Sequence, residues 1–337
     1  MCVRVARTVG AAFARLGALA LVLILFASPF FAEAQRAEKV WRIGYLANVP
    51  PITPEVARNW NGFVDGLREH GYVEGRNLVI ERRYAEGRAD RWPELASELV
   101  RLKVDVIVVN TTPAALAAKN ASSAIPIVQM GAIDPVGAGL AASLARPGGN
   151  VTGLAILFPE LAAKGLALLK EARPGLSRVA VLWNAANPAN ASVLRETETA
   201  ARASGLTLQS VPVRAPKDFE DAFAQVRADG LLVLGDVLMF QQRKQIAEFI
   251  TQKRLPAVTQ FREMTELGAL MSYGVDLAAM FRRAANYVDR VLKGARPGDL
   301  PFEQPTKFEL TLNLKTAKSL GLTIPPSLLL QANYVIE

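Results

Sequence analysis

The segment that most constrains the fold of this chain is Val104–Pro113, with the sequence VDVIVVNTTP. Its first six residues are almost all apolar and β-branched, which is typical of a parallel strand that is buried on both faces. A short polar turn, Asn110-Thr111-Thr112, follows the strand, and Pro113 favours the first turn of a helix. The segment therefore predicts a strand, a tight turn and a helix over Ala114–Lys119, which is the repeating unit of α/β proteins.

The turn between this strand and this helix is a candidate site for an anion. Backbone N–H groups at a helix N-terminus have no partner within the helix and attract negative charge, and the hydroxyls of Thr111 and Thr112 add two donors. We expect a ligand carboxylate to bind here. The alternative is that one of the two threonines only caps the helix, because threonine is favoured at that position.

The same alternation of short apolar runs and amphipathic segments continues along the chain from Trp41. Repeated β-α-β units favour a parallel sheet with helices on both faces. Strands are expected at 41–47, 77–84, 104–109, 126–130, 151–156, 178–184, 206–213, 230–236, 257–260, 268–273 and 308–312. Helices are expected at 54–70, 90–101, 114–119, 188–204, 218–227, 239–253, 277–293 and 314–320, with one more between the strands at 126–130 and 151–156. The tail from Pro325 is expected to be irregular or to form a terminal strand.

Because this pattern occurs twice, the sequence predicts an α/β protein of two doubly wound parallel-sheet lobes joined by a multi-strand hinge. The first lobe is expected to hold residues 35–153 plus about 275–301, and the second residues 154–274 plus about 302–337. Chain crossings near Val151–Pro159 and Gly274–Asp276 are expected to let the lobes close around a ligand, as in a Venus flytrap.

The first 34 residues have the pattern of a secretory signal peptide. A basic start precedes an apolar run at 16–31, and Ala32-Glu33-Ala34 fits a small-x-small cleavage site. We expect cleavage after Ala34, a mature chain that begins near Gln35, and a periplasmic location; the alternative is an uncleaved membrane anchor. The only cysteine, Cys2, lies in this segment, so thiol chemistry is not expected of the mature chain.

Composition and motifs argue against several classes of function. The formal net charge of +8 is spread along the chain without a block of basic residues, so nucleic-acid binding is not expected. The only histidine is His70, beside Gly71, and no nucleophile–base pair or G-x-G-x-x-G motif occurs. We therefore expect no catalytic residues, no metal and no cofactor.

Polar and aromatic side chains at the carboxyl ends of the expected strands are the candidate ligand contacts, because ligands of open α/β sheets bind there. Asp236, in the second lobe, would meet the ammonium of an amino acid whose carboxylate binds the Thr111 turn, and Tyr273 and Trp183 could stack on its side chain. The alternatives are that Asp236, Asp134 and Asp276 cap helices. The apolar run 237–240 after Asp236 indicates a less polar ligand or a contact between lobes. The full set of candidates is Asn48, Asn110, Thr111, Thr112, Asp134, Asn184, Asp236 and Tyr273.

Several motifs together resemble a known family, the ABC-transporter substrate-binding proteins of the tryptophan/tyrosine-binding-like group. They are RIGYL at 42–46, HGYVEGRN at 70–77, VDVIVVNTTPAALAAK at 104–119, IPIV at 125–128, DPVGAGLAASLARPGGNVTGL at 134–154, RVAVLWNAANPA at 178–189 and SYGVD at 272–276. The resemblance covers nearly all of the mature chain, and the match at 134–154 is its most specific part. It implies the type I periplasmic binding protein fold. It also implies that Asn110–Thr112 form the first-lobe binding turn and that Asn184 and Asp236 make second-lobe contacts.

The function that this resemblance implies is the capture of a small solute in the periplasm and its delivery to the membrane permease of an ABC importer. We expect a carboxylate-bearing solute, such as an aromatic or branched amino acid, held between the lobes of a monomer. Two alternatives remain open: a ligand-binding sensor module for a membrane receptor, and a secreted enzyme on the same scaffold. Neighbouring permease and ATPase genes would favour transport, and turnover of a bound ligand would favour the enzyme.

Overall fold

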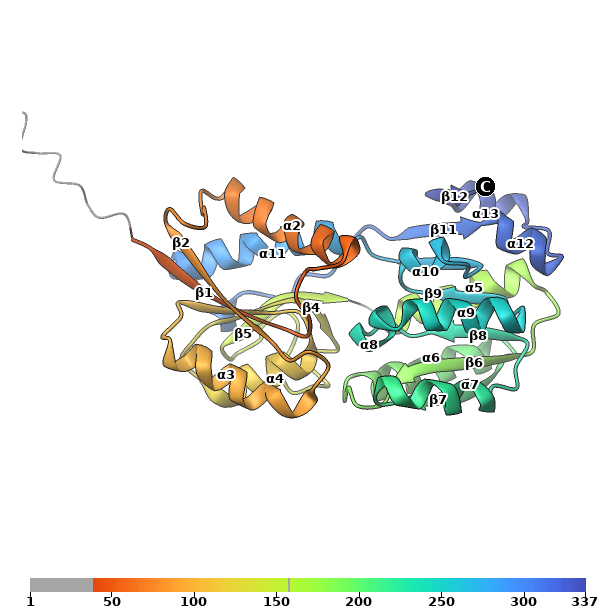
Figure 1. Cartoon of the computed structure of the whole chain (residues 1–337), viewed down its shortest axis with the longest axis horizontal. Coiled ribbons are helices and arrows are strands. Elements are labelled where there is room, and N and C mark those ends of the chain that lie inside the picture. Colours follow the sequence, from red (N-terminus) through yellow and green to blue (C-terminus); the bar gives the residue numbers. More distant parts are fainter. Residues whose placement is uncertain (1–38, 157) are drawn as a thin grey trace, which may run out of the picture. The chain divides into compact units, whose positions relative to one another are not determined.

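The protein is described by a computed structural model that covers residues 39–156 and 158–337. The predicted signal peptide, residues 1–34 with Cys2 and the cleavage point at Ala34, lies outside the described residues. Residues Trp41–Glu337 form one compact unit that is built on two separate β-sheets (Figure 1). Within the described ranges, no helix is long and apolar enough to span a membrane.

The first sheet has five strands in the order β2-β1-β3-β4-β5, and each of its pairings is parallel. Its strands are β1 (Trp41–Ala47), β2 (Leu78–Tyr84), β3 (Val106–Val109), β4 (Ile127–Ile133) and β5 (Val151–Ile156). Side chains of β3 alternate between two cores, with Val106 and Val108 on one face and Ile107 and Val109 on the other. Both faces are covered, as the apolar sequence of this strand predicts.

Two pairs of helices cover this sheet (Figure 1). On one face lie α2 (Pro54–Glu69) and α11 (Leu277–Leu292), and on the other lie α3 (Trp92–Arg101) and α4 (Thr112–Ala121), with the short helix η1 (Ala89–Arg91) before α3. Helix α2 lies very close to α11 because Gly62 and Gly66 face it. A Cβ atom on Gly62 would be 2.4 Å from the carbonyl oxygen of Ala278, so only glycine permits this approach.

The second sheet has seven strands in the order β12-β11-β10-β9-β8-β6-β7. Its strands are β6 (Arg178–Asn184), β7 (Thr207–Val213), β8 (Gly230–Val233), β9 (Ala257–Thr259), β10 (Met271–Gly274), β11 (Glu309–Asn313) and β12 (Tyr334–Ile336). All pairings are parallel except that of β10 with β11, which is antiparallel. The late strand β11 therefore enters this sheet from the opposite direction.

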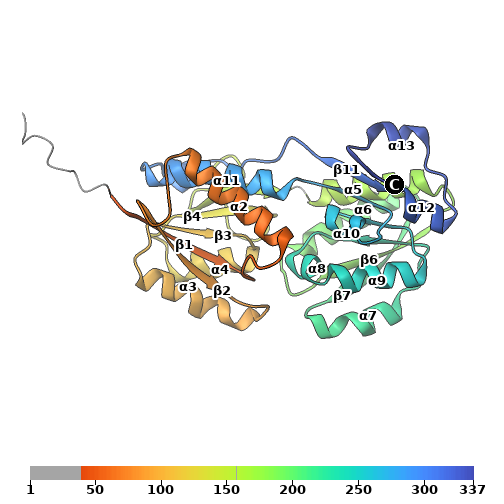
Figure 2. The same ribbon diagram turned by 45° about the horizontal axis from the view of Figure 1, so that its top comes forward.

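Helices also lie on both faces of the second sheet. Helices α5 (Phe158–Ala172) and α6 (Asn190–Ala203) pack on one face, and α7 (Phe219–Gln225) and α9 (Arg243–Lys253) on the other. Near the C-terminus, α13 packs against α5 (Figure 2). The remaining short helices are η2 (Pro216–Asp218), α8 (Val237–Gln241), α10 (Arg262–Glu266), η3 (Pro297–Asp299), α12 (Leu314–Leu320) and α13 (Pro326–Gln331).

The chain crosses between the two sheets three times: from β5 to α5, from β10 to α11, and between Glu303 and β11. Before the third crossing, the backbone of Glu303 pairs with Leu154 of β5. The structure is thus two α/β lobes, each with a mainly parallel sheet, joined by a multi-strand hinge. This is the fold class that the sequence predicts.

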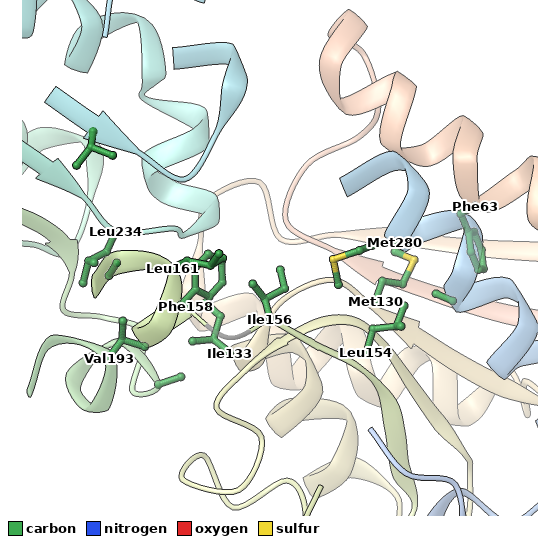
Figure 3. Packing of buried hydrophobic residues seen from close by; sticks show 14 of the residues in the cluster. Phe63, Met130, Ile133, Leu154, Ile156, Phe158, Leu161, Val193, Leu234 and Met280 are labelled. Carbon is green, nitrogen blue, oxygen red and sulfur yellow. The ribbon is translucent and has the colours of Figure 1, made fainter. Parts of the chain in front are cut away.

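One hydrophobic cluster continues from the first lobe into the second (Figure 3). Ile133, Ile156 and Phe158 lie in the middle of this cluster, between first-lobe side chains such as Met130 and second-lobe side chains such as Leu161. These three residues stand at the ends of β4 and β5 and at the start of α5. The first crossing between the lobes is therefore packed within apolar side chains of both lobes.

Some predicted elements are wrong in type or extent. No helix forms between β4 and β5, because residues 134–150 make a series of turns, with positive φ at Asp134 and at two glycines, Gly139 and Gly148. The helix predicted at 239–253 is two helices, α8 and α9, and the strand predicted at 230–236 ends at Val233. Helix α5 was not predicted, and the tail forms α13 and β12.

Candidate functional site

Two adjoining cavities lie between the lobes, at the carboxyl ends of strands of both sheets. The aromatic cavity is lined by five aromatic rings and by several amide side chains; these are Tyr45, Phe158, Phe240, Phe261 and Phe281, with Asn59, Asn110 and Gln241. The polar cavity has more hydrogen-bonding side chains in its lining; among them are Asn48, Thr111, Asn184, Asn187, Arg214 and Asp236. Asp236, Val237 and Gln241, at and after the end of β8, line both cavities and form the wall between them.

The turn between β3 and α4 places its two threonines differently. Thr111 is the N-cap of α4, and its hydroxyl accepts a hydrogen bond of 3.2 Å from the backbone N–H of Ala114. It also lines the polar cavity. Thr112 is buried, its hydroxyl lies 3.5 Å from the carbonyl oxygen of Ile133, and it lines neither cavity. Thr111 therefore caps α4, and the same residue lies on the lining of the polar cavity.

Asp236 is the centre of a buried hydrogen-bond cluster. One carboxylate oxygen accepts from the Asn184 amide and from the backbone N–H of Leu238, both at 2.8 Å, which makes Asp236 the N-cap of α8. The other oxygen accepts from the amides of Asn187, at 2.8 Å, and Asn190, at 3.2 Å. Since a carboxylate offers about four lone-pair positions, the protein itself occupies all of them.

The charge of Asp236 is balanced by these dipoles and by no cation. Within the described part of the chain, no arginine or lysine forms an ion pair with it. Burial raises the pKa of the Asp236 carboxyl, and the hydrogen bonds from Asn187 and Asn184 and the other donors act in the opposite direction. Arg214 is an exposed cationic side chain on the lining of the polar cavity, and its guanidinium lies 3.5 Å from the carbonyl oxygen of Ala185.

The other predicted contacts lie in three different environments. Asn48 lines the polar cavity, where its side-chain oxygen accepts a hydrogen bond of 2.9 Å from the N–H of Gly87. Asp134 lines neither cavity; its carboxylate accepts from the Ser192 hydroxyl of α6, at 2.6 Å, and so joins the two lobes. Tyr273 also lies outside both cavities, with its ring 6.0 Å from that of Phe308.

Asp134 corrects one capping prediction and Asp276 confirms another. The carboxylate of Asp134 accepts from the N–H of Gly137, at 2.8 Å, so it caps a turn and not a helix. Asp276 caps α11 through the backbone N–H groups of Ala278 and Ala279. Trp183 donates to the Ser210 hydroxyl at 2.9 Å and lines neither cavity.

The aromatic cavity contains residues that sequence reasoning missed. The side-chain oxygens of Asn59 and Asn110 and the side-chain nitrogen of Gln241 are buried, and none has a hydrogen-bond partner among the described residues. Of these three, only Asn110 was predicted. The apolar run 237–240 was the single sequence signal for this cavity, since it includes Phe240.

The backbone at Phe158 is held in place by a buried glutamine. The Gln260 amide donates to the Phe158 carbonyl oxygen, at 3.1 Å, and its oxygen accepts from the backbone N–H of Gly235. A Cβ atom on Gly235 would lie 1.9 Å from the Phe158 ring, so glycine is needed where β8 leads into the cavity wall. This arrangement fixes the wall of the aromatic cavity at the start of α5, where the chain first crosses between the lobes.

The linings of the two cavities offer aromatic and aliphatic surface, neutral amides, the hydroxyls of Thr111 and Tyr45, one carboxylate, Asp236, whose lone pairs are occupied, and one guanidinium, Arg214. Among the residues that the structure describes, no group of three or more His, Cys, Asp or Glu side chains could hold a metal ion.

Comparison with known proteins agrees with this picture. The family model described as ABC transporter substrate binding protein matches residues 52–336. The tyrosine-binding protein of Clostridioides difficile (strain R20291) is 27% identical over 271 residues, which are 80% of this chain and 78% of that protein.

Two solved structures are similar over most of the chain. The ABC domain in complex with L-Trp from Streptococcus pneumonia has a TM-score of 0.82 and 27% identity, and the match covers 88% of this chain and 99% of that one. A conserved domain protein from Vibrio cholerae has a TM-score of 0.83 and 29% identity, with 88% and 100% covered. With two α/β lobes of type I periplasmic binding protein architecture and a family match over 52–336, the chain belongs to the ABC transporter substrate-binding proteins.

Proposed function

We propose that the protein is the periplasmic solute-binding component of an ABC importer and that it captures a small carboxylate-bearing solute with an aromatic or branched apolar body. An aromatic or branched amino acid is the type of solute that fits best. The observation that carries this proposal is the aromatic cavity, in which five rings surround buried amide atoms that lack a protein partner. Unpaired buried polar atoms are costly, so a ligand that pairs with them gains binding free energy.

The two cavities suggest how such a solute would lie. Its apolar body would fill the aromatic cavity, where the oxygens of Asn59 and Asn110 can accept hydrogen bonds from an N–H or O–H group and the Gln241 amide can donate one. Its carboxylate would point into the polar cavity, toward the N-terminus of α4 and the guanidinium of Arg214.

The predicted contacts divide accordingly. Asn110 is proposed as a direct contact in the aromatic cavity. Asn48, Thr111, Asn184 and Asp236 are proposed to shape the polar cavity, because each of them is already bonded to protein groups there. All four lone-pair positions of the Asp236 carboxylate accept hydrogen bonds from the protein. An ammonium group that approached Asp236 would therefore find no free lone pair there. Thr112, Asp134 and Tyr273 lie outside both cavities and are not part of this proposal.

The chemical character of this site also suits the ligands that its relatives bind. The similar protein of Clostridioides difficile is described as tyrosine-binding, and the similar Streptococcus structure holds L-Trp. Both ligands combine a ring with a carboxylate and an ammonium group. For the present chain we propose the same class of solute without choosing one member of it.

A thermal-shift screen of the purified chain from Gln35 tests this proposal. The panel contains L-tryptophan, L-tyrosine, L-phenylalanine, L-leucine and 3-phenylpropanoate, and calorimetry follows each hit. A compound at about a hundred times its dissociation constant stabilises the fold by about 2.7 kcal/mol, which is a clear shift in Tm. Comparison of L-phenylalanine with 3-phenylpropanoate isolates the ammonium group. If no compound of the panel stabilises the protein, the proposed class of solute is wrong.

Export and transport need separate tests. We propose that the chain is exported, that cleavage occurs near Ala34, and that it delivers its solute to a membrane permease as a monomer. Mass spectrometry of the exported protein should give an N-terminus near Gln35. Recovery of the full-length chain in the membrane fraction would contradict cleavage, and normal uptake of the identified solute in a deletion strain would contradict the transport role.

A further inference from the structure

Gly131 lies in β4 at the point where this strand reaches the aromatic cavity. It lines the cavity together with Ile133 of the same strand and Ile156 of β5. Every other residue of β4 is buried, whereas Gly131 is half-buried. Since glycine has no side chain, the surface that β4 offers to the cavity at this point is main chain.

The strand is irregular at the same place. Two residues of β4, Met130 and Gly131, stand opposite one residue of β5, Leu154, which makes a β-bulge. On the other side, β3 pairs with β4 only as far as Gln129. The main chain of Gly131 is therefore outside the paired register of both neighbouring strands where it meets the cavity.

The fold itself does not require glycine at this position. Gly131 is not among the glycines with positive φ, so other residues can adopt its backbone conformation. Apart from its own neighbours in the chain, a Cβ atom there would have only the Ile156 side chain within 4 Å among the described residues. The nearest atom would be the Cδ1 methyl of Ile156, at 3.3 Å, which is the free end of a side chain. Backbone geometry and packing thus leave the glycine unexplained.

A glycine inside a strand weakens it, because it adds conformational entropy to the unfolded chain and has no side chain to pack. Such a glycine often marks a bulge, or a place where a ligand or another backbone comes close. This bulge needs no positive φ at Gly131, and no other backbone lies near its Cβ position. What remains is a group in the cavity that lies against the main chain.

The rest of the lining indicates the shape of that group. Rings of Phe158, Phe240 and Phe261, from the second lobe, line the same cavity. Phe158 and Ile156 lie next to each other where the chain first crosses between the lobes (Figure 3). A planar ring can touch a bare main chain with one face and aromatic side chains with the other, so it gains contact on both sides. A branched alkyl group is not flat and gains less.

We propose that Gly131 is a specificity-determining residue that lets the ring of an aromatic solute lie against the main chain of β4. It makes the site prefer aromatic solutes to branched aliphatic ones. This inference rests on the proposed function and selects the aromatic class within it. Gly131 and Ile156 both belong to the first lobe, so the surface at Gly131 does not depend on the distance between the lobes.

Calorimetric titration with L-tryptophan, L-phenylalanine and L-leucine tests this proposal on the purified chain from Gln35. The parent chain should bind both aromatic solutes more tightly than L-leucine. One methyl group in an apolar site changes affinity by about 10- to 200-fold, so Gly131→Ala should weaken both aromatic solutes by about tenfold or more and change L-leucine by less than about threefold. Gly131→Val should remove the preference for the aromatic solutes.

A double-mutant cycle separates contact with the ring from contact with Ile156. Ile156→Val removes the methyl carbon that lies nearest to the new Cβ atom. If Gly131 makes room for the ring, Gly131→Ala should cause the same loss of aromatic affinity in the Ile156→Val chain as in the parent chain. If the loss disappears in the Ile156→Val chain, the glycine only makes room for Ile156 and the proposal is wrong.

Gly44→Ala is the matched control. Gly44 lies in β1 of the same sheet, also lacks a positive φ and lines neither cavity, and its Cβ would be 3.1 Å from the Leu99 methyl groups. Its ratio of L-tryptophan to L-leucine affinity should equal that of the parent chain, and circular dichroism checks that each variant is folded. An equal change of this ratio in Gly44→Ala would contradict a specific role for Gly131.

The remaining outcomes separate this inference from the proposed function. If the aromatic solutes bind the parent chain and Gly131→Ala leaves their affinity unchanged, or if L-leucine binds the parent chain most tightly, the inference is wrong and the proposed function stands. If none of the panel binds the parent chain, the proposed function is wrong and the inference falls with it.

Discussion

The polar cavity and the aromatic cavity share Asp236 and Gln241, but their other hydrogen-bonding side chains differ in how many of them are bonded to protein groups. In the polar cavity, the side chains of Asn48, Thr111 and Asn184 are all bonded to backbone or side-chain groups of the protein. In the aromatic cavity, the oxygens of Asn59 and Asn110 have no such partner among the described residues. The more polar cavity is therefore the more self-sufficient one.

This difference shows that a polar residue at a strand end is not in itself a ligand contact. A group whose hydrogen bonds are complete contributes to the shape and stability of the site. A group that is buried and has no protein partner is available for a hydrogen bond with a ligand.

The largest effect is expected for Asp236→Ala, which removes the acceptor of four hydrogen bonds. Each buried donor left unpaired costs about 1–3 kcal/mol, so the free energy of unfolding should fall by about 3 kcal/mol or more. Urea denaturation measures it. The control is Asp276→Ala, which removes an exposed helix cap and should cost only about 1 kcal/mol. Equal losses for both would show that Asp236 is an ordinary cap.

The next largest effect is expected for Gly235→Ala. The new methyl group would lie 1.9 Å from the Phe158 ring and 2.6 Å from the Gln260 side-chain oxygen, so one wall of the aromatic cavity must move. Overpacking of this kind typically costs about 1–3 kcal/mol. Thermal unfolding and solute titration should both show a loss. Gly175→Ala is the control, since nothing lies within 4 Å of its added Cβ atom. Unchanged affinity in Gly235→Ala would place the solute elsewhere.

Asn110→Ala and Asn48→Ala compare the two cavities directly. Asn110→Ala should weaken binding of the identified solute by about tenfold, which corresponds to about 1.4 kcal/mol, and should leave the free energy of unfolding unchanged because its oxygen bonds to no protein group. Asn48→Ala should do the opposite: lose about 1 kcal/mol of stability with its bond to Gly87, and keep its affinity. Calorimetric titration and urea denaturation of both variants decide it. A reversed result would assign binding to the polar cavity.

The smallest effect is expected for Thr111→Ala. The change removes the N-cap of α4, so the free energy of unfolding should fall by about 1 kcal/mol. If the hydroxyl only caps the helix, affinity for the solute should change by less than about threefold, or about 0.7 kcal/mol. Thr111→Ser, which can still cap, is the matched control. A large loss of affinity at normal stability would make Thr111 a direct contact.

Local features of this protein could be predicted because their causes lie within a few residues. Thr111 and Asp276 cap helices by bonding to backbone groups two or three positions ahead, and strand β5 was predicted with its observed bounds from its local sequence. The prediction of a helix within residues 134–150 was wrong, and the reason is also local. Asp134-Pro135 is typical of a helix start, but the glycines that follow allow turns instead.

The candidate site could be predicted only in part, because the partners of its residues are distant in the sequence. The amides that surround Asp236 are 46 to 52 positions away from it, so their number could not be read from the strand that ends there. The rings of the aromatic cavity come from β1, the start of α5, α8, the residue before α10 and α11. No spacing in the sequence connects them.

The sequence by itself determined the two α/β lobes, since apolar strands and amphipathic helices alternate over most of the chain from Trp41. Only the tertiary structure decided which polar atoms are satisfied. Packing of α2 against α11 and the crossings near Phe158 bring Asn59 and Asn110 into one apolar cavity, and the folding of residues 184–190 around Asp236 fills its carboxylate. The physical reason is that burial removes water from both kinds of group, but the fold supplies a partner to only one of them.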